Sequence, residues 1–310
     1  MGKTAFLFSG QGSQYVGMGR ELLENNEIVC SIFNIADREL GFSLSELCFH
    51  GPKEELDKTE NTQPAVLTVS VAAYKALEEQ GIQPDLAAGL SLGEYSALVC
   101  SGALDFAEAV KLVRQRGRYM QEAVPQGEGG MAAILGLETD KVEEACRLAS
   151  VAGVVQVANY NCPGQIVISG QSKALRLASA KAGELGAKRV IPLDVSGPFH
   201  TGLLQPASEK LSLELNKVKI DSLRIPVISN VTADYIQDGQ ILDLLPRQVM
   251  NPVLWEMTIR KMLQEGVDTF VEIGPGSALR GFVKKIDRKT TLLNVEDMTS
   301  LQAVVEHFKS

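Results

Sequence analysis

The chain of 310 residues is 45% hydrophobic and 22% charged, so it is long enough for one large domain or two with a substantial core. A formal net charge of −8 argues against nucleic acid or an anionic membrane surface as the main partner. Five cysteines without a Cys-x-x-Cys pair, three histidines, and the lack of a signal-like or membrane-spanning apolar run predict a cytoplasmic protein with reduced thiols and no metal site.

The first third of the chain alternates short apolar runs with helical patterns. A buried strand is predicted at residues 4–8, and the glycine-rich turn at 9–14 follows it. Such a turn places backbone N–H groups at the carboxyl edge of a sheet, where α/β proteins bind ligands. Helical periodicity then continues to about residue 40. A second helix is predicted at 64–80, with Pro64 in its first turn.

Residues 85–99 combine a short apolar run, the turn Gly89-Leu90-Ser91-Leu92-Gly93 and a segment rich in alanine and leucine. This order predicts a strand, a sharp turn and a helix, with Ser91 at the apex. The free N–H groups at the start of the helix could stabilise an oxyanion there. The alternative is a capping box, in which Ser91 and Glu94 only close the helix start. The context favours a serine nucleophile.

Asp105 is predicted to cap a helix that runs to about Val124, and a different pattern follows. The order strand, helix, strand, strand, helix, strand is that of a ferredoxin-like unit. Its predicted elements lie at 131–135, 139–150, 154–159, 165–169, 172–186 and 188–193. We therefore predict a ferredoxin-like subdomain at 127–195, inserted into a discontinuous α/β-hydrolase-like catalytic domain at 1–126 and 196–310.

The alternation of strands and helices resumes after the insertion. Strands are predicted at 226–230, 269–273 and 291–295, and helices at 203–215, 242–250, 255–264, after the Gly-Pro-Gly turn at 274–276, and at 299–308. This alternation predicts an α/β fold with a mainly parallel sheet that is covered by helices on both faces.

A serine hydroxyl needs a base to act as a nucleophile at neutral pH, and the chain offers three histidines. His307 lies in the last turn of the terminal helix, and His50 precedes a Gly-Pro turn that we expect at the surface. His200 lies in a loop stiffened by glycine and proline and follows Ser91 in chain order. It is therefore favoured as the base, with a purely structural histidine as the alternative.

No acid stands out as the third member of a triad. Asp194 and Asp297 are candidates, and a backbone carbonyl could orient the imidazole equally well. Composition and spacing therefore predict a Ser–His acyl enzyme on an α/β scaffold, without distinguishing hydrolysis from transfer.

Seven motifs, in order along essentially the whole chain, resemble those of the malonyl-CoA:acyl carrier protein transacylase family. They are Gly10-Gln11-Gly12-Ser13-Gln14, the serine turn from Gly89 to Ala97, Arg116-Gly117, the segment from Asn159 to Gln165, Ser196-Gly197-Pro198-Phe199-His200, the segment from Gln248 to Val253, and Glu272-Ile273-Gly274-Pro275-Gly276. The set is far more specific than any one motif. The sequence departs from the family at Leu90, where histidine is common, so we expect one polar contact beside the acyl group to be missing.

The resemblance implies a reaction. Ser91 would attack the thioester of malonyl-CoA, His200 would take its proton, and the main-chain carbonyl of Gln248 would orient the imidazole. The phosphopantetheine thiol of an acyl carrier protein would then take the malonyl group in a ping-pong cycle. No cofactor is implied, because malonyl-CoA is a substrate and phosphopantetheine is carried by the partner.

The resemblance also assigns the binding groups. The backbone N–H groups of Gln11 and Leu92 would form the oxyanion hole. Arg116 would bind the malonyl carboxylate, which a planar guanidinium matches with two parallel hydrogen bonds. Arg114 and Arg118 are expected to be surface residues of the same helix.

Carrier proteins are typically acidic, so a chain at −8 needs a local basic patch to bind one. The candidates are Lys284, Lys285, Arg288 and Lys289, with Lys188 and Arg189 on the insertion. The alternative is a solvated helix face. We expect a monomer that acts in fatty acid synthesis. The other functions considered are a stand-alone acyltransferase serving a polyketide synthase, a serine thioesterase or hydrolase, and a non-catalytic scaffold.

Overall fold

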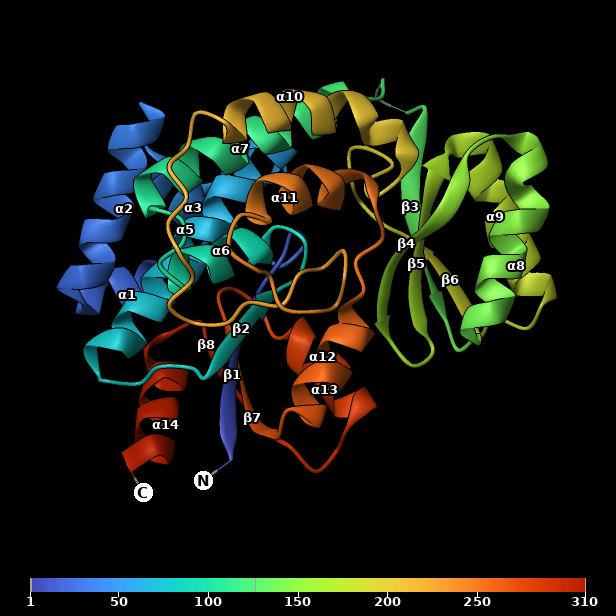
Figure 1. The fold of residues 1–310 in the computed structure, drawn as a ribbon. Coiled ribbons are helices and arrows are strands. Elements are labelled where there is room, and N and C mark those ends of the chain that lie inside the picture. The colour runs from blue at the N-terminus through green and yellow to red at the C-terminus, as the bar shows by residue number, and fades with distance from the viewer. Residues whose placement is uncertain (1, 126, 310) are drawn as a thin grey trace.

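The computed structural model describes residues 2–125 and 127–309, which form a large lobe and a small lobe side by side (Figure 1). The large lobe holds both ends of the described chain and is built around one sheet. The small lobe interrupts it with a second sheet and two helices. The predicted domain boundary at residue 126, like the outer limits at 1 and 310, lies outside the described residues.

The sheet of the large lobe has four parallel strands. In spatial order they are β2 (Leu86–Gly89), β1 (Lys3–Phe8), β7 (Val267–Ile273) and β8 (Thr291–Val295). Alternate residues of β1 point to opposite faces, so Phe6 and Phe8 pack into one core cluster while Ala5 and Leu7 pack into another. Burial on both faces explains why β1 is a continuous apolar run.

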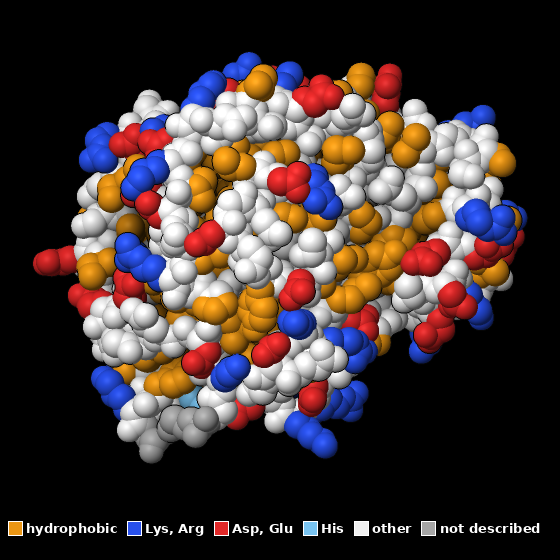
Figure 2. All heavy atoms as spheres, in the orientation of Figure 1, with side chains coloured by type: hydrophobic (Ala, Val, Ile, Leu, Met, Phe, Trp, Pro, Cys, Tyr) orange, Lys and Arg blue, Asp and Glu red, His pale blue; other side chains and the backbone are white. Residues whose placement is uncertain are grey.

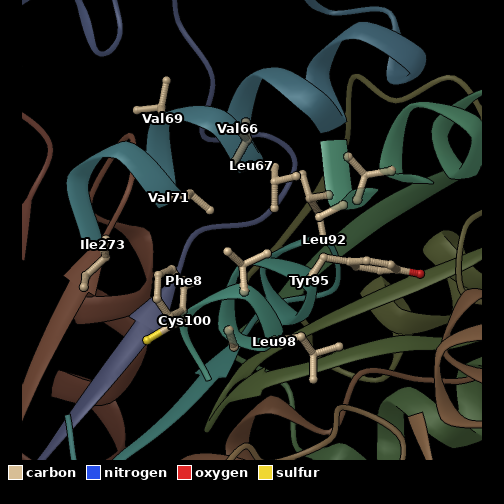
Figure 3. Packing of buried hydrophobic residues seen from close by; sticks show 14 of the residues in the cluster. Phe8, Val66, Leu67, Val69, Val71, Leu92, Tyr95, Leu98, Cys100 and Ile273 are labelled. Atoms are coloured by element: carbon tan, nitrogen blue, oxygen red, sulfur yellow. The ribbon is translucent and has the colours of Figure 1, made fainter. Parts of the chain in front are cut away.

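Helices cover both faces of this sheet, as predicted. On the face of Phe6 and Phe8, the core is closed by α1 (Arg20–Asn25), α2 (Glu27–Leu40), α3 (Leu44–His50), α4 (Lys53–Leu56), α5 (Thr59–Glu79), α6 (Gly93–Cys100), α7 (Phe106–Glu122), α10 (Gln205–Leu215), α11 (Ile241–Met250) and α14 (Met298–Lys309). Side chains of α5 and α6 meet Phe8 and Ile273 there (Figure 3). The opposite face is covered by α12 (Trp255–Gln264) and α13 (Ala278–Ile286).

Two predictions in the large lobe are wrong in detail. Helix α5 begins at Thr59, five residues before the predicted start, so Pro64 lies inside the helix. Its missing N–H costs one helical hydrogen bond, and burial of nearly the whole helix compensates for it. Residues 226–230 form an extended edge segment instead of a strand. Val227 makes a single parallel bridge to Ala87, and Pro226 has no N–H with which to continue the ladder.

The small lobe confirms the predicted order of elements. Its sheet is antiparallel, in the order β4-β5-β3-β6, which is the ferredoxin-like arrangement. The elements are β3 (Gly129–Leu135), α8 (Thr139–Ala149), the 3₁₀ turn η1 (Ser150–Ala152), β4 (Val155–Cys162), β5 (Gln165–Gln171), α9 (Ser172–Glu184) and β6 (Arg189–Pro192). Helices α8 and α9 share one separate core with the sheet.

Strand β4 also ties the small lobe to the large one. The N–H of Val253 donates to the Ala158 carbonyl at 2.8 Å, and the N–H of Tyr160 donates to the Val253 carbonyl at 3.0 Å. Apolar side chains gather along the junction of the two lobes (Figure 2). No helix in the described part of the chain is long and apolar enough to cross a membrane.

Candidate active site

Ser91 lies at the apex of the turn between β2 and α6, where the sequence predicts it. Its φ of 52° is in the left-handed region, which is strained for a serine. Glycines on both sides make the turn possible. A Cβ at Gly89 would collide with the backbone of Gly93, and a Cβ at Gly93 would collide with the Phe8 carbonyl. Helix α6 can therefore begin directly against the ends of β1 and β2.

The alternative capping box is wrong. The residue that precedes α6 is Leu92, which makes no side-chain capping bond. The Glu94 carboxylate lies fully buried and turns away from the helix start. Its Oε2 accepts from the N–H of Asn230 at 2.9 Å and from Nε2 of Gln248 at 2.8 Å. The serine hydroxyl is therefore not engaged in closing the helix.

His200 meets the serine from the loop after the small lobe. Its Nε2 lies 2.8 Å from the Ser91 Oγ. On the other side of the ring, Nδ1 lies 2.9 Å from the Gln248 carbonyl and 3.2 Å from that of Asn251. Carbonyl oxygens can only accept, so Nδ1 carries the proton of the neutral ring. The lone pair of Nε2 is then free to accept the serine proton.

Neither acid considered from the sequence orients this histidine. Asp194 is exposed at the rim of the cavity. Asp297 precedes α14, where its Oδ1 accepts from the N–H of Ser300 at 2.8 Å. The backbone carbonyls of Gln248 and Asn251 occupy the position of a triad acid. The other two histidines lie elsewhere, with His50 exposed and paired with Glu46 on α3.

The pKa of His200 sets an expected pH dependence. Burial, with Arg116 nearby, lowers this pKa from 6.5 to about 4, against the opposing effect of the bonds to the Gln248 and Asn251 carbonyls. A base works only when it is neutral. The rate of serine acylation should therefore be flat above about pH 5 and fall about tenfold per pH unit below 4.

Single-turnover acylation followed by quenched-flow mass spectrometry between pH 3.5 and 8 measures this profile. Circular dichroism at each pH serves as the control for unfolding. A midpoint near the ordinary histidine pKa would contradict the expectation.

Arg116, on α7, points into the same site and is buried together with two glutamines. Its Nη2 donates to the Ser91 Oγ at 3.1 Å and to Oε1 of Gln248 at 2.9 Å, while Nη1 donates to Oε1 of Gln63 at 2.8 Å. Its guanidinium carbon lies 5.4 Å from the centre of the Tyr95 ring. Within the described residues Nε has no partner. A fixed cation with unused donors thus lies beside the serine.

The two other arginines of α7 are directed elsewhere. The Nη1 of Arg114 donates to the Leu40 carbonyl, and its guanidinium lies over the ring of Phe42. Arg118 pairs with Glu122 in solvent. The helix therefore presents one arginine to the site, and spacing alone did not single it out.

The predicted oxyanion donors lie at two adjoining chain segments. Leu92 directly follows the serine, and Gln11 lies in the turn after β1. The two segments touch, because the N–H of Leu90 donates to the Phe8 carbonyl at 3.1 Å. In residues 2–125 and 127–309, neither Gln11 nor Leu92 uses its backbone N–H for a hydrogen bond. Both are available to a ligand.

A cavity of about 570 Å³ opens over the serine and draws its lining from both lobes. The large lobe contributes the turn after β1, Leu90, Ser91 and His200, and the small lobe contributes Asn159 and Asn161. Leu90 gives this wall of the cavity an apolar side chain. No cluster of three or more metal-ligating side chains occurs in the part of the chain that the structure describes.

Four further residues shape the site without a clear sequence signal. Gln63, Glu94, Asn230 and Asn251 come from four separate segments and are joined to the site by side-chain or carbonyl hydrogen bonds. Their hydrogen-bond partners lie up to 154 residues away along the chain. Local patterns do not record such contacts, although the spacing of Glu94 from Ser91 did draw attention to it.

A serine hydroxyl that is hydrogen-bonded to a neutral histidine on an α/β core defines the class of serine acyl-transfer enzymes. The acyl transferase domain family matches residues 5–305. The malonyl CoA-acyl carrier protein transacylase of Bacillus subtilis is 50% identical over 100% of this chain and 98% of its own length. The chain belongs to the malonyl-CoA–acyl carrier protein transacylases of the acyl transferase family.

Solved structures agree with this assignment. The transacylase of the same name from Clostridium perfringens is 50% identical and has a TM-score of 0.96, with 99% of this chain and 97% of that one covered. A malonyl-transacylase in complex with a type II polyketide synthase acyl-carrier protein is 41% identical with a TM-score of 0.96, and the coverage is 98% and 99%.

Proposed function

We propose that the protein transfers the malonyl group from malonyl-CoA to the phosphopantetheine thiol of an acyl carrier protein in fatty acid synthesis, through a malonyl-Ser91 intermediate. The observation that carries the proposal is the Arg116 Nη2, 3.1 Å from the Ser91 Oγ. A carboxylate can reach this guanidinium from an acyl group on Ser91 when the acyl chain is short. Malonyl has its acid group one methylene from the carbonyl and meets this requirement.

In the first half-reaction, Ser91 is the nucleophile and His200 is the base. Nε2 of His200 takes the Ser91 proton as Oγ attacks the thioester carbonyl. We assign the unused N–H groups of Gln11 and Leu92 to the resulting oxyanion, with a stabilisation of about 3 kcal/mol for each donor. The tetrahedral intermediate then collapses, the carbon–sulfur bond breaks, and His200 returns the proton to the departing coenzyme A thiolate.

The second half-reaction runs the same steps with the carrier. The phosphopantetheine thiol gives its proton to His200 and attacks the carbonyl of malonyl-Ser91. The bond to Oγ breaks, and Ser91 leaves with the proton from His200. The chain thus returns to its starting state, and no other reactant is consumed.

Partition of the intermediate tests this function against the alternative of a serine hydrolase. The enzyme is mixed with malonyl-CoA, the covalent adduct is measured by intact-mass spectrometry, and holo acyl carrier protein or buffer alone is then added. Rapid loss of the adduct with formation of malonyl carrier supports transfer. Equally rapid loss in buffer would establish a hydrolase. The likeness to the polyketide complex makes a polyketide carrier the second candidate, and a parallel assay with both carriers ranks them.

Two of the basic residues proposed for carrier docking, Lys285 and Lys188, lie near the junction of the lobes. Nζ of Lys285, on α13, donates to Oε1 of Gln165 on the small lobe at 2.9 Å. The carbonyl of Gly164, the residue before Gln165, accepts from the N–H of Gly136, and the Lys188 side chain packs against Gly136. Positive charge from the two lobes can therefore act on one acidic partner.

Reversal of charge at this patch is expected to weaken carrier binding. The Lys284→Glu/Lys285→Glu protein should show a rise in KM for carrier of about tenfold, while its malonylation by malonyl-CoA stays unchanged. The matched control is Lys217→Glu/Lys219→Glu, which changes two exposed lysines after α10. Equal effects on both half-reactions, or none on either, would refute the patch.

We also infer a cytoplasmic location. All five cysteines are free thiols, and four of them are buried, which suits a reducing compartment.

A further inference from the structure

The side chain of Asn230 is fully buried and bridges the two arms of the serine turn. Its Nδ2 donates to the Gly89 carbonyl at 2.8 Å, and its Oδ1 accepts from the N–H of Ser91 at 2.6 Å. The amide thus joins the last residue of β2 to the apex of the turn and passes over Leu90. These two hydrogen bonds hold the bent backbone from Gly89 to Ser91, and we call them the Asn230 clamp.

The extended segment before Asn230 places it there. The parallel bridge between Ala87 and Val227 sets the register, so the chain reaches Asn230 beside the end of β2. The backbone of Asn230 is then held at both polar groups. Its N–H donates to Oε2 of Glu94 at 2.9 Å, and its carbonyl accepts from the N–H of Leu254 at 2.9 Å.

Glu94 connects this clamp to the rest of the site. The Nε2 of Gln248 donates to the same Glu94 Oε2 at 2.8 Å and to the Ser91 carbonyl at 3.0 Å. The carbonyl of Gln248 in turn accepts from Nδ1 of His200. The side chain of Asn230 therefore holds the N–H of Ser91, and the side chain of Gln248 holds its carbonyl. Both residues also donate a hydrogen bond to the buried Glu94 carboxylate.

We propose that Asn230, held by Glu94, is a positioning residue for the acylation step. It keeps Ser91 in the left-handed conformation at φ 52° that aims Oγ at His200. It also withdraws the N–H of Ser91 from the cavity, so that the N–H of Leu92 remains to face the oxyanion. The proposal rests on the proposed function, because acylation of Ser91 is the step that it controls.

Asn230→Asp is the sharpest test because it changes one atom. The aspartate still accepts from the N–H of Ser91, but its ionised second oxygen faces the Gly89 carbonyl as one acceptor against another. Burial and the neighbouring Glu94 carboxylate raise the pKa of the introduced aspartate above its ordinary value, and the protonated acid restores the donor. Single-turnover malonylation should therefore be within about threefold of wild type at pH 5 and fall about 100-fold below it at pH 8.

The wild-type protein is the reference for this pH profile. Glu94 faces the new aspartate directly, while Arg116 and His200 face it across Gln248 and Ser91. All three are present in both proteins, so their titrations affect both profiles. Asn216→Asp is the matched control, since the Nδ2 of this exposed asparagine also donates to a backbone carbonyl, that of Ser212, at 2.9 Å. It should follow the wild-type profile.

Two further measurements separate positioning from binding and from folding. In a Ser91→Ala background, Asn230→Asp should leave the Kd for malonyl-CoA within about twofold, because the clamp does not touch the acyl group. Burial raises the pKa of Glu94 to about 7. Glu94→Gln keeps an oxygen for both donors but removes the charge, and it should lower the acylation rate about tenfold at pH 8, where the wild-type carboxylate is ionised.

Parallel pH profiles for Asn230→Asp and wild type would overturn the proposal, as would a loss of malonyl-CoA affinity that matches the loss of rate. If the Asp variant does not fold, a wild-type rate in Glu94→Gln overturns it. Absence of malonylation in the wild-type protein is a different outcome, which refutes the proposed function itself.

Discussion

Ser91→Ala is expected to abolish the malonyl adduct in intact-mass spectrometry and to lower transfer to the carrier at least about 10⁴-fold. The Ser91 Oγ is the oxygen that His200 Nε2 is placed to deprotonate, at 2.8 Å. Alanine leaves the turn, the cavity and Arg116 in place. The loss therefore reports the missing nucleophile and not a missing binding site.

Ser96→Ala is the control for this experiment. Ser96 lies five residues further along in α6, and its hydroxyl is buried without a partner in the described chain. The control should form the adduct at the wild-type rate, and peptide mapping should locate the malonyl group on Ser91. An adduct that persists in Ser91→Ala, or that maps to another serine, would contradict the mechanism.

Arg116→Ala is expected to lower kcat/KM for malonyl-CoA about 10³-fold, because a buried charge-assisted pair with the substrate carboxylate is worth about 4 kcal/mol. Acetyl-CoA has no carboxylate, so its kcat/KM should change by less than about tenfold. The preference for malonyl-CoA over acetyl-CoA should therefore be largely lost. Parallel steady-state assays with both substrates measure it.

Arg114→Ala provides the matched control, since it removes a guanidinium from the same helix that contacts Leu40 and Phe42. Its preference for malonyl-CoA should be unchanged. An equal loss for malonyl-CoA and acetyl-CoA in Arg116→Ala would mean that Arg116 supports the fold of the site and does not select the acid group.

Much of the fold could be predicted because local sequence patterns indicate most of its helices and strands. The strand 291–295 and the helix 255–264 were predicted to the residue, and the ferredoxin-like order followed from periodicity alone. The serine turn was found because a nucleophile on a sharp turn needs small neighbours. The start of α5 was predicted too late, because a proline usually marks the first turn of a helix. Burial in the tertiary structure allows Pro64 to lie inside this one.

The site was predictable where one residue type carries the chemistry. Three histidines made His200 easy to find, whereas carbonyls that orient it have no residue type of their own. Asn230 was not found because its partners, Ser91 and Gly89, lie 139 and 141 residues away. The segment that carries Asn230, residues 226–230, was predicted to be an ordinary strand. Only the bridge to β2 reveals that its end reaches the serine turn.

The bonds between β4 and Val253 have a consequence for substrate choice. Asn159 of β4 lines the cavity, and Val253 lies two residues after Asn251, whose carbonyl holds the imidazole. The width of the cavity and the aim of the base are therefore mechanically coupled. Spreading the lobes for a bulkier acyl group is therefore expected to move His200 out of line with Ser91, so oversized thioesters should lose turnover as well as affinity.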